Sequence, residues 1–494
     1  MIDCGMFQGN KAMKDRNYTE FPFNPAEIDF MILTHAHVDH SGLIPKLVKK
    51  GFKGTIYCTT ATKDLCTIVL PDSGYIQEME IERKNRKLSR AGEPLLEPIY
   101  TSNDAYDSLN LFHGVPMKNI IRIDDEISFK FNEAGHILGS SIIELWVGAE
   151  KIVFSGDLGN KNQPIIKDPD YISEADYLVI ESTYGDRKHS DQYNKEEKLI
   201  EIIKDTFARG GNLIIPAFAV ERTQDLLYYL HNIKNSGIFD NLPIYVDSPL
   251  AIKATNIFCN RQEYYDVETT ELAKFNNECP FIYDDITFTQ TADESKNINT
   301  IKNGAIIISA SGMAEAGRIK HHLKHNLWRA ESTVLFVGYQ AIGTLGRRIK
   351  DGEKTVRIHG EEVAVNAKVL YLDGFSAHAD QDGLIDWIDH FESFPQHVFI
   401  VHGEEESSGE FARIIKEKYT TNVTIPKLEE SFELQSTEIK TLNMVSEISP
   451  NNVTNLFGEI ISSLTAKVSK GLERKEYTRL LEKLNRLKDN VDKI

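Results

Sequence analysis

The sequence of 494 residues has few cysteines, no long hydrophobic run and no signal-peptide pattern. No apolar stretch approaches the roughly 20 residues that span a bilayer, so no membrane partner is expected and a cytoplasmic location is favoured. The cysteines form no C-x-x-C pair, which argues against a disulfide framework and against a cysteine zinc knuckle. We expect most of them to be buried as small hydrophobic side chains: Cys4, Cys58, Cys66, Cys259 and Cys279.

Positive charge is also scarce, because the formal net charge is −18. This excess of acid argues against diffuse attraction to nucleic acid, since phosphate binding depends on lysine and arginine. Two segments are locally basic, at 318–329 and 347–357. Each is either a solvated helix face or the wall of a basic groove, and the sequence leaves both interpretations open.

Short apolar strands alternate with helical stretches along most of the chain. The composition, 41% hydrophobic and 26% charged, is that of an ordinary globular protein, and the length predicts about two to four domains. The first predicted strands are 30–34, 55–57, 152–155 and 177–181. Several carry polar residues at their C-terminal ends, where α/β folds bind their ligands. A second α/β alternation runs from 186 to 346, after which 369–372 and 397–402 resemble the first region again. This pattern predicts one α/β domain inserted into another.

The two ends of the chain lie outside this alternation. Residues 1–5 read as the end of a buried strand that runs into a glycine turn, so we expect one or two earlier strands to be missing. From residue 455 the tail is helical, and an apolar stripe along it predicts a packing face or a homodimer face. The stripe consists of Tyr477, Leu480, Leu481, Leu484 and Leu487.

Residues 35–40 read H-A-H-V-D-H and offer four potential metal ligands directly after a strand. Neutral imidazole and carboxylate are natural ligands of zinc and similar metals. The loop must be tight, because His35 and His37 have to face one ion while Asp39 and His40 face a second. A lone histidine here would be structural, whereas four ligands at this spacing predict a metal site.

Three further side chains can complete two coordination spheres. His136, Asp157 and His378 each lie at the end of an apolar strand, beside glycine or another small residue. Small neighbours let the backbone approach a metal closely. We therefore expect these three residues to join the 35–40 loop.

In combination, these motifs resemble those of the metallo-β-lactamase fold: Asp3, the 35–40 run, His136, Asp157 and His378. Further segments resemble the marks of its β-CASP branch, which includes the nuclease subunit of the pre-mRNA cleavage and polyadenylation machinery and its prokaryotic relatives. These segments are E-S-T-Y-G at 181–185, G-T-L-G at 343–346 and F-S-A-H-A-D at 375–380.

The resemblance covers roughly residues 1–430 and implies an α/β fold, a metallo-β-lactamase αββα sandwich with an inserted α/β β-CASP domain. The first domain would comprise 1–187 and 348–435, the inserted domain 188–347, and a helical tail 436–494.

The resemblance also implies a site for two Zn²⁺ ions. One would be held by His35, His37 and His136, and the other by Asp39, His40 and His378, with Asp157 as the bridge. Asp3 would orient a ligand histidine through the ring nitrogen that faces away from the metal.

Catalytic roles are expected for Asp39, Asp157, Glu181 and His402. Glu181 resembles an acid of the branch that pairs with a histidine, and for His402 a structural role is equally open. Some members carry a histidine, a candidate general acid, shortly after Gly-Thr-Leu, where this chain has two arginines. The proton donor for the leaving group therefore stays open.

Substrate contacts are expected in three loops. Ser311 and Gly312 lie in a small-residue loop whose N–H groups suit a phosphate, with a tight turn that binds nothing as the alternative. Arg348 is expected to clamp a phosphate, and Ser376 belongs to the F-S-A-H-A-D segment.

These residues favour a zinc-dependent ribonuclease that hydrolyses phosphodiester bonds of single-stranded RNA in RNA processing or decay, as an endonuclease with or without exonuclease activity. Two adjacent metals lower the pKa of a bridging water and so supply hydroxide at neutral pH. One alternative is a small-molecule hydrolase of the same fold. Another is a DNA nuclease, because no motif in the sequence indicates recognition of the 2′-hydroxyl that distinguishes RNA from DNA. An idle RNA-binding subunit is disfavoured, because all seven ligand positions are filled.

Overall fold

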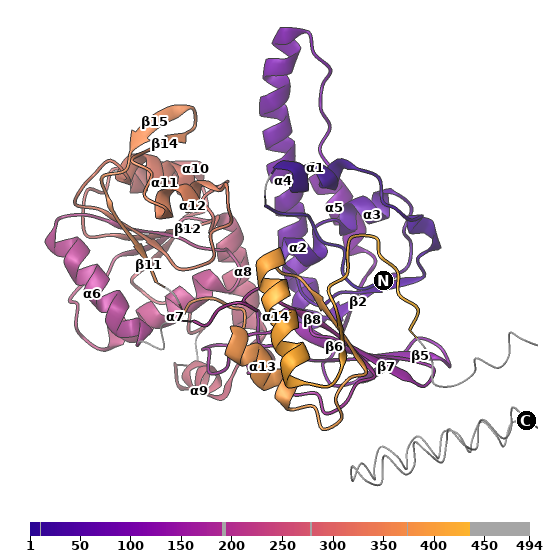
Figure 1. Ribbon diagram of the computed structural model, residues 1–494. Coiled ribbons are helices and arrows are strands. Elements are labelled where there is room, and N and C mark those ends of the chain that lie inside the picture. Colours follow the sequence, from indigo (N-terminus) through magenta and orange to yellow (C-terminus); the bar gives the residue numbers. More distant parts are fainter. Residues whose placement is uncertain (10, 190–193, 277–278, 373, 435–494) are drawn as a thin grey trace, which may run out of the picture.

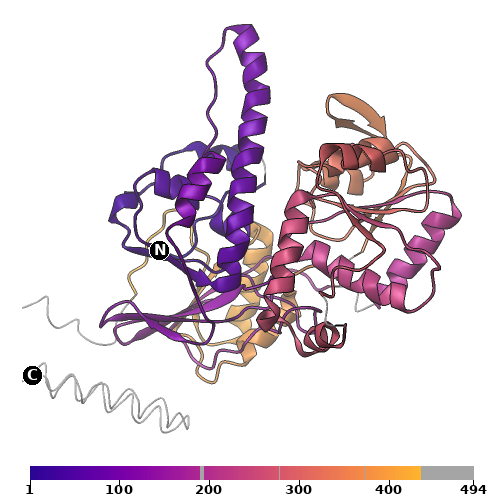
Figure 2. The same cartoon turned by 180° about the vertical axis from the view of Figure 1, so that it is seen from behind.

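The computed structural model describes residues 1–9, 11–189, 194–276, 279–372 and 374–434. These residues form two α/β domains that lie side by side, and one long helix projects from the first domain (Figures 1 and 2). The tail with the apolar stripe lies outside the described residues, so the homodimer face stays a prediction.

The first domain contains two sheets packed face to face. A parallel sheet has the order β1-β2-β3, and a mixed sheet has the order β18-β17-β8-β7-β6-β5-β4. Ile32 and Ile143 lie between the sheets together with Phe129 and Phe131, and all four are fully buried. Phe129 and Phe131 are two positions apart on β5, so both point into this layer.

Helices cover the outer face of each sheet (Figure 1). Leu65 and Leu70 of α4 pack on the β1-β2-β3 sheet, while Trp387 of α13 and Phe411 of α14 pack on the other sheet. The layers therefore run helix, sheet, sheet, helix, which confirms the predicted αββα sandwich.

The strands of this domain are β1 (Phe30–Ile32), β2 (Thr55–Thr59), β3 (Phe112–Val115), β4 (Ile120–Arg122), β5 (Ile127–Glu133), β6 (Ser141–Val147), β7 (Glu150–Phe154), β8 (Tyr177–Glu181), β17 (His397–Val401) and β18 (Asn422–Thr424). Its helices are α1 (Lys11–Asp15), α2 (Val38–Ser41), α3 (Ile44–Lys49), α4 (Thr60–Ala91), α5 (Ser102–Leu109), α13 (Gln381–Asp389) and α14 (Glu405–Lys418), with short 3₁₀ turns at Arg16–Tyr18 and Pro25–Glu27.

The inserted domain is built on a six-stranded parallel sheet with the order β11-β10-β12-β9-β13-β16. Its inner strands are buried on both faces and so read as continuous apolar runs. On β12, Ile306 and Ile308 join the cluster that contains Leu227 of α7, whereas Ile307 joins the cluster that contains Leu323 of α11. Helices therefore cover both faces of this sheet.

The strands of the inserted domain are β9 (Leu213–Pro216), β10 (Ile244–Val246), β11 (Ile286–Phe288), β12 (Ile306–Ser309), β13 (Thr333–Phe336) and β16 (Lys368–Tyr371), with a separate hairpin of β14 (Thr355–Ile358) and β15 (Glu361–Ala364). Its helices are α6 (Lys195–Ala208), α7 (Arg222–Asn235), α8 (Pro249–Asn260), α9 (Val267–Asn276), α10 (Ala292–Ile298), α11 (Ile319–Asn326) and α12 (Leu345–Lys350), with a 3₁₀ turn at Gln262–Tyr264.

One domain boundary differs from the sequence-based expectation, which returned the chain to the first domain at residue 348. The structure instead pairs β16 with β13 of the inserted sheet, in parallel, with Val369 opposite Val334. The return to the first domain therefore follows Tyr371. A short apolar strand has no local signal for which of two sheets it joins, because hydrogen bonds to a distant partner make that choice.

The two domains are joined by polar contacts. Arg261 Nε donates to Asp64 Oδ2 at 2.6 Å, and the hydroxyls of Thr60 and Tyr264 lie 2.8 Å apart. Glu221 reaches from the inserted domain into the first, where it accepts a hydrogen bond of 2.9 Å from the N–H of Leu138.

The cysteines follow the expectation only in part. Cys4, Cys58 and Cys66 are free and buried, as expected. Cys259 and Cys279 form a disulfide in the inserted domain, which the sequence analysis did not expect, because 20 positions separate them and only the fold brings their Cα atoms to 5.2 Å. Among the described helices, none is both long and apolar enough to cross a bilayer.

Glu133, at the end of β5, makes the stability of the first domain depend on pH. It is 3% exposed, and burial raises its pKa to about 8. An unfolded glutamate titrates near pH ~4.3, so folding takes up a proton between these values and stability falls as the pH rises through this window. We expect Glu133→Gln to unfold at a higher temperature than the wild type at pH ~8, with the difference vanishing near pH ~4.

Thermal unfolding at several pH values tests this expectation. Glu93→Gln, which changes an exposed carboxylate, is the matched control. Parallel curves of melting temperature against pH for the wild type and Glu133→Gln would contradict the expectation.

Candidate metal centre

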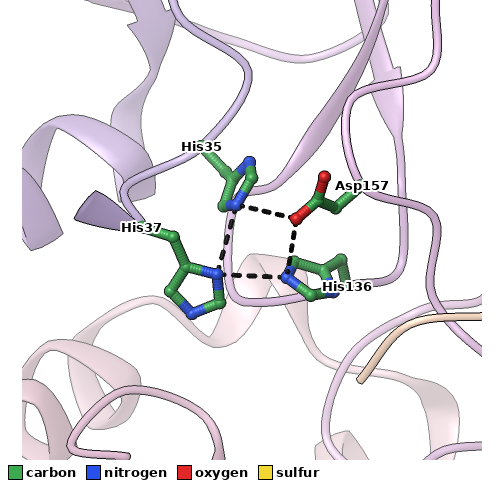
Figure 3. Close-up of side chains that lie close together, drawn as sticks. All are labelled: His35, His37, His136 and Asp157. Atoms are coloured by element: carbon green, nitrogen blue, oxygen red, sulfur yellow. Dashed lines mark hydrogen bonds and ion pairs between the residues drawn. The ribbon is translucent and has the colours of Figure 1, made fainter. Parts of the chain in front are cut away.

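Four side chains, three of them buried and His37 partly exposed, converge at one end of the sheets: His35, His37, His136 and Asp157 (Figure 3). His37 Nδ1 lies 3.2 Å from His35 Nε2 and 3.1 Å from His136 Nε2. Asp157 Oδ2 closes the ring at 3.5 Å from His35 Nε2 and 3.4 Å from His136 Nε2. Ligand atoms that converge in this way suit a metal ion.

A second group beside the first contains Asp39, His40 and His402. His402 Nε2 lies 3.1 Å from His40 Nε2 and 3.6 Å from Asp39 Oδ2. The sequence analysis placed His378 in this group and gave His402 a catalytic or structural role. The structure brings His402 here instead, because His402 directly follows β17 and β17 pairs with β8 in the middle of the sheet.

Asp157 lies between the two groups. Its Oδ2 faces the first group, while its Oδ1 lies 3.3 Å from His40 Nε2 and 3.5 Å from His402 Nδ1. Both oxygens are buried and accept no hydrogen bond from the described part of the chain. Because a buried carboxylate without donors is unfavourable, a cation on each side of Asp157 fits this arrangement.

Backbone conformation places these side chains. Gly135 and Gly156, next to His136 and Asp157, have positive φ values of 67° and 55°. A Cβ atom on Gly135 would come within 2.7 Å of the Pro169 ring. His402 also has a positive φ of 49°, which is uncommon for a side chain with a Cβ and is frequent at functional sites.

Burial and charge set the protonation of the centre. Burial holds the pKa of His35 and His136 well below the usual range and lowers that of His37 to about 4. Burial alone would raise the pKa of Asp157, but the charges of His40 and other histidines outweigh it and hold this pKa well below its usual value. The neutral imidazoles of His35, His37 and His136 beside the ionised carboxylate form a donor set that suits zinc and similar metals.

Asp3 supports the second group from behind. Its Oδ2 lies 2.7 Å from His40 Nδ1, and Oδ1 and Oδ2 accept hydrogen bonds of 2.8 Å from the N–H and hydroxyl of Thr34. A carboxylate on one ring nitrogen fixes the orientation of the imidazole, so His40 presents Nε2 to the centre.

His378 lies at the edge of the centre with Glu181. Its Nδ1 is 3.1 Å from Glu181 Oε2 and 3.9 Å from Asp157 Oδ2. Burial lowers the pKa of His378, but the charges of Glu181 and Asp157 outweigh it and raise the pKa above its usual value. The protonated imidazole is therefore favoured, and Nε2 remains available to a ligand.

Three of the four residues expected to bind substrate lie in the inserted domain, and each has partners there. The Ser311 hydroxyl donates to the carbonyl of Ala316 at 3.3 Å, and Gly312 lies in the same loop. Arg348 forms a two-point ion pair with Glu353, with Nη2 to Oε2 at 2.7 Å, so a phosphate would compete with that carboxylate. Ser376 is close to the centre and lines a cavity of about 10 Å³ together with His136.

Two supporting residues were missed by the sequence analysis. Asn160 Nδ2 donates to the carbonyls of Ser376 and His378, at 2.9 and 2.7 Å, and so holds the His378 loop. Glu221 holds the loop after His136 through the N–H of Leu138. The only local signal for Asn160 was its position three residues after Asp157, and Glu221 had none because it belongs to the other domain.

Family models match the chain in three successive segments. The metallo-β-lactamase superfamily matches residues 1–206, the β-CASP domain matches 223–349, and a Zn-dependent metallo-hydrolase RNA specificity domain matches 362–426. A protein of Thermus thermophilus named as a ribonuclease is 36% identical over 406 residues, which cover 82% of this chain and 88% of that protein. The chain belongs to the β-CASP family of the metallo-β-lactamase superfamily.

Archaeal members of the β-CASP family are also similar to this chain. The transcription termination factor FttA of Methanocaldococcus jannaschii is 31% identical over 441 residues, which cover 86% of this chain and 66% of the factor. The factor of the same name from Methanococcus maripaludis is 32% identical over 422 residues, which cover 82% of this chain and 63% of the factor. The chain thus spans about two thirds of these archaeal relatives.

Gly5 controls the position of the second ligand group. A Cβ atom added at Gly5 would overlap the carbonyl of Asp39, which belongs to α2 and cannot move without Asp39 and His40. We expect Gly5→Ala to lower metal affinity by about 10- to 100-fold, the range seen when the supports of ligands are removed. Metal content after dialysis, measured by mass spectrometry, gives the result.

Gly409→Ala is the matched control, because a Cβ atom at Gly409 in α14 meets nothing within 4 Å. This variant should retain the metal content of the wild type. Equal metal content in the Gly5→Ala variant would show that α2 tolerates the displacement.

Proposed function

We propose that this protein is a ribonuclease that uses two zinc ions to hydrolyse phosphodiester bonds of single-stranded RNA. The observation that carries the proposal is the position of Asp157, whose two oxygens face two separate groups of ligands. The match of 362–426 to an RNA specificity domain and the ribonuclease of Thermus thermophilus support RNA as the substrate.

The ligands divide around Asp157. His35, His37 and His136 would hold one ion, and Asp39, His40 and His402 would hold the other. His402 takes the place first expected for His378, because His378 Nδ1 is already directed at Glu181. Zinc ions bound there would neutralise charge on the phosphoryl oxygens and activate water for in-line attack.

His378 is suited to protonate the leaving oxygen. Glu181 holds its Nδ1 and is itself fixed, because Glu181 Oε1 accepts a hydrogen bond of 2.6 Å from the N–H of Leu158. The pKa of His378, which the charges of Glu181 and Asp157 raise against the effect of burial, favours the protonated form that a proton donor needs. A positioned acid of this kind contributes about 100- to 10,000-fold to the rate.

Two variants separate the roles of the histidines. His402→Ala should lose one of two bound metal ions together with activity, because it removes a ligand. His378→Ala should retain both ions and still lose about 100-fold or more in kcat, because it removes the proton donor. Metal content and single-turnover cleavage measured on the same preparations test this division, and loss of metal from His378→Ala would reverse it.

Cleavage of a labelled single-stranded RNA tests the proposed function itself. The purified protein should cut the RNA, a chelator should stop the reaction, and added zinc should restore it. The double variant Asp39→Ala and His40→Ala should bind less metal and leave the RNA intact.

Other substrates decide between the proposed function and its alternatives. Single-stranded DNA of the same sequence should be cut more slowly, and equal rates would point to a nuclease that does not distinguish RNA from DNA. If the folded, zinc-loaded protein cuts neither nucleic acid, the proposal fails and a small-molecule hydrolase takes its place.

A further inference from the structure

The far end of α4 carries a concentration of positive charge that the metal centre does not use. Residues 83–90 read R-K-N-R-K-L-S-R and contain no acid, in a chain of net charge −18. Five cations of this segment are exposed: Arg83, Lys84, Arg86, Lys87 and Arg90. Among the described residues, Arg86 pairs with Glu82 at 2.6 Å, and the other four form no ion pair.

This end of α4 projects from the first domain as an arm, which we define as residues 82–97 (Figures 1 and 2). Arg83 lies about 35 Å along the helix axis from Thr60, given the rise of an α-helix. Asn85 holds the returning chain against the helix, because its side chain donates to the carbonyl of Leu96 and accepts from its N–H, both at 2.9 Å. The cations are therefore carried on a supported element.

Three of the cations lie on the side of α4 that faces the inserted domain. Asp72 lies on this side, because the charge of Lys253 on α8 of the inserted domain acts on it. That charge opposes the rise in the pKa of Asp72 that burial causes. Arg83 lies three turns beyond Asp72, at nearly the same angle around the axis. Lys87 and Arg90 lie one and two turns further on the same face.

The part of the inserted domain that faces the arm carries cations as well, and one of them, Lys324, pairs with Glu361 at 2.7 Å. Lys320 and Lys324 lie on α11, and His321 of this helix stacks on His359 of the β14–β15 turn with ring centroids 4.5 Å apart. Burial lowers the pKa of His359, and the charges of His321, Lys320 and Arg83 lower it further. Arg83 of the arm therefore lies close enough to the β14–β15 turn of the inserted domain for its charge to act on His359.

We propose that the arm and α11 form a surface that binds the backbone of single-stranded RNA at a distance from the metal centre. Two surfaces of like charge repel each other, and phosphates bound between them would relieve the repulsion. Sites for single strands combine cations that follow the backbone with rings on which bases stack, and the exposed His321–His359 pair provides such rings. The proposal rests on the proposed function for the identity of the strand.

The test measures RNA affinity against salt concentration in the non-cleaving background of Asp39→Ala and His40→Ala. The arm variant combines Arg83→Gln, Lys87→Gln and Arg90→Gln, which preserve helix propensity. Loss of three phosphate contacts should reduce the slope of log affinity against log salt by about 2 and weaken binding of an RNA of about 30 nucleotides at least ~10-fold at low salt.

The matched control changes the same charge elsewhere. Lys49, Lys50 and Lys53 are exposed at the end of α3 and just after it, in the first domain and outside the segment that matches the RNA specificity domain. Their triple change to glutamine should leave the salt slope as it is in the parent protein. If the salt slope falls equally in both triple variants, the loss of net charge explains the effect and the proposal is overturned.

A second measurement separates this surface from the metal centre. An RNA of about 4 nucleotides bound at the metal centre leaves no phosphates for the arm, whose Arg83 lies about 35 Å along α4 from Thr60, so the arm should favour long over short RNA. In the metal-loaded protein, the ratio of kcat/KM for the ~30-nucleotide RNA to that for the ~4-nucleotide RNA should fall by at least ~10-fold in the arm variant.

The outcomes distinguish the two proposals. If the parent protein binds RNA and never cleaves it, the proposed function fails while the salt slopes still decide the role of the arm. An arm variant with the parent slope and the parent ratio of kcat/KM overturns the RNA-binding surface. If the parent protein shows no binding of single-stranded RNA, both proposals are overturned.

Discussion

A carboxylate buried without hydrogen-bond donors has to meet positive charge, and the centre of the first domain is arranged around this requirement. Asp157 is 1% exposed, and its two oxygens face histidines on both sides. The histidines reach it from the loops after β1, β5 and β17, which the two sheets bring to one place. The stable packing of the sandwich thus holds a set of groups that would be unfavourable without cations between them.

The inserted domain contacts the loops that carry the metal ligands. Glu221 extends from its α7 end to the backbone of Leu138, two residues after His136. Tyr339 after β13 donates to Glu404 Oε1 at 2.6 Å, two residues after His402. The loops that carry His136 and His402 therefore both contact the inserted domain, on either side of Asp157.

The net charge of the chain and its local charge on α4 have opposite signs. The chain as a whole is acidic, which disfavours indiscriminate binding of nucleic acid. Exposed cations are concentrated where α4 leaves the body of the protein, opposite α11. An acidic protein with a local positive surface can direct a polyanion to one place, because the field there has the opposite sign to that of the rest of the surface.

The sequence by itself determined the fold class and most of the centre. The H-x-H-x-D-H run and the strand-end residues His136 and Asp157 predicted metal ligands. Both signals are local, because they consist of the spacing of ligands within one loop and of a glycine next to a ligand. The alternation of apolar strands and helical stretches between 186 and 346 predicted a second α/β domain in the same way. Only the tertiary structure shows that His402 lies beside Asp39 and that His378 lies beside Glu181, because each histidine follows a strand and long-range strand pairing positions His402. It also decided that β16 joins the inserted sheet and that Cys259 meets Cys279. These are contacts between segments far apart in the chain, and local sequence carries no record of which distant segment will be the partner.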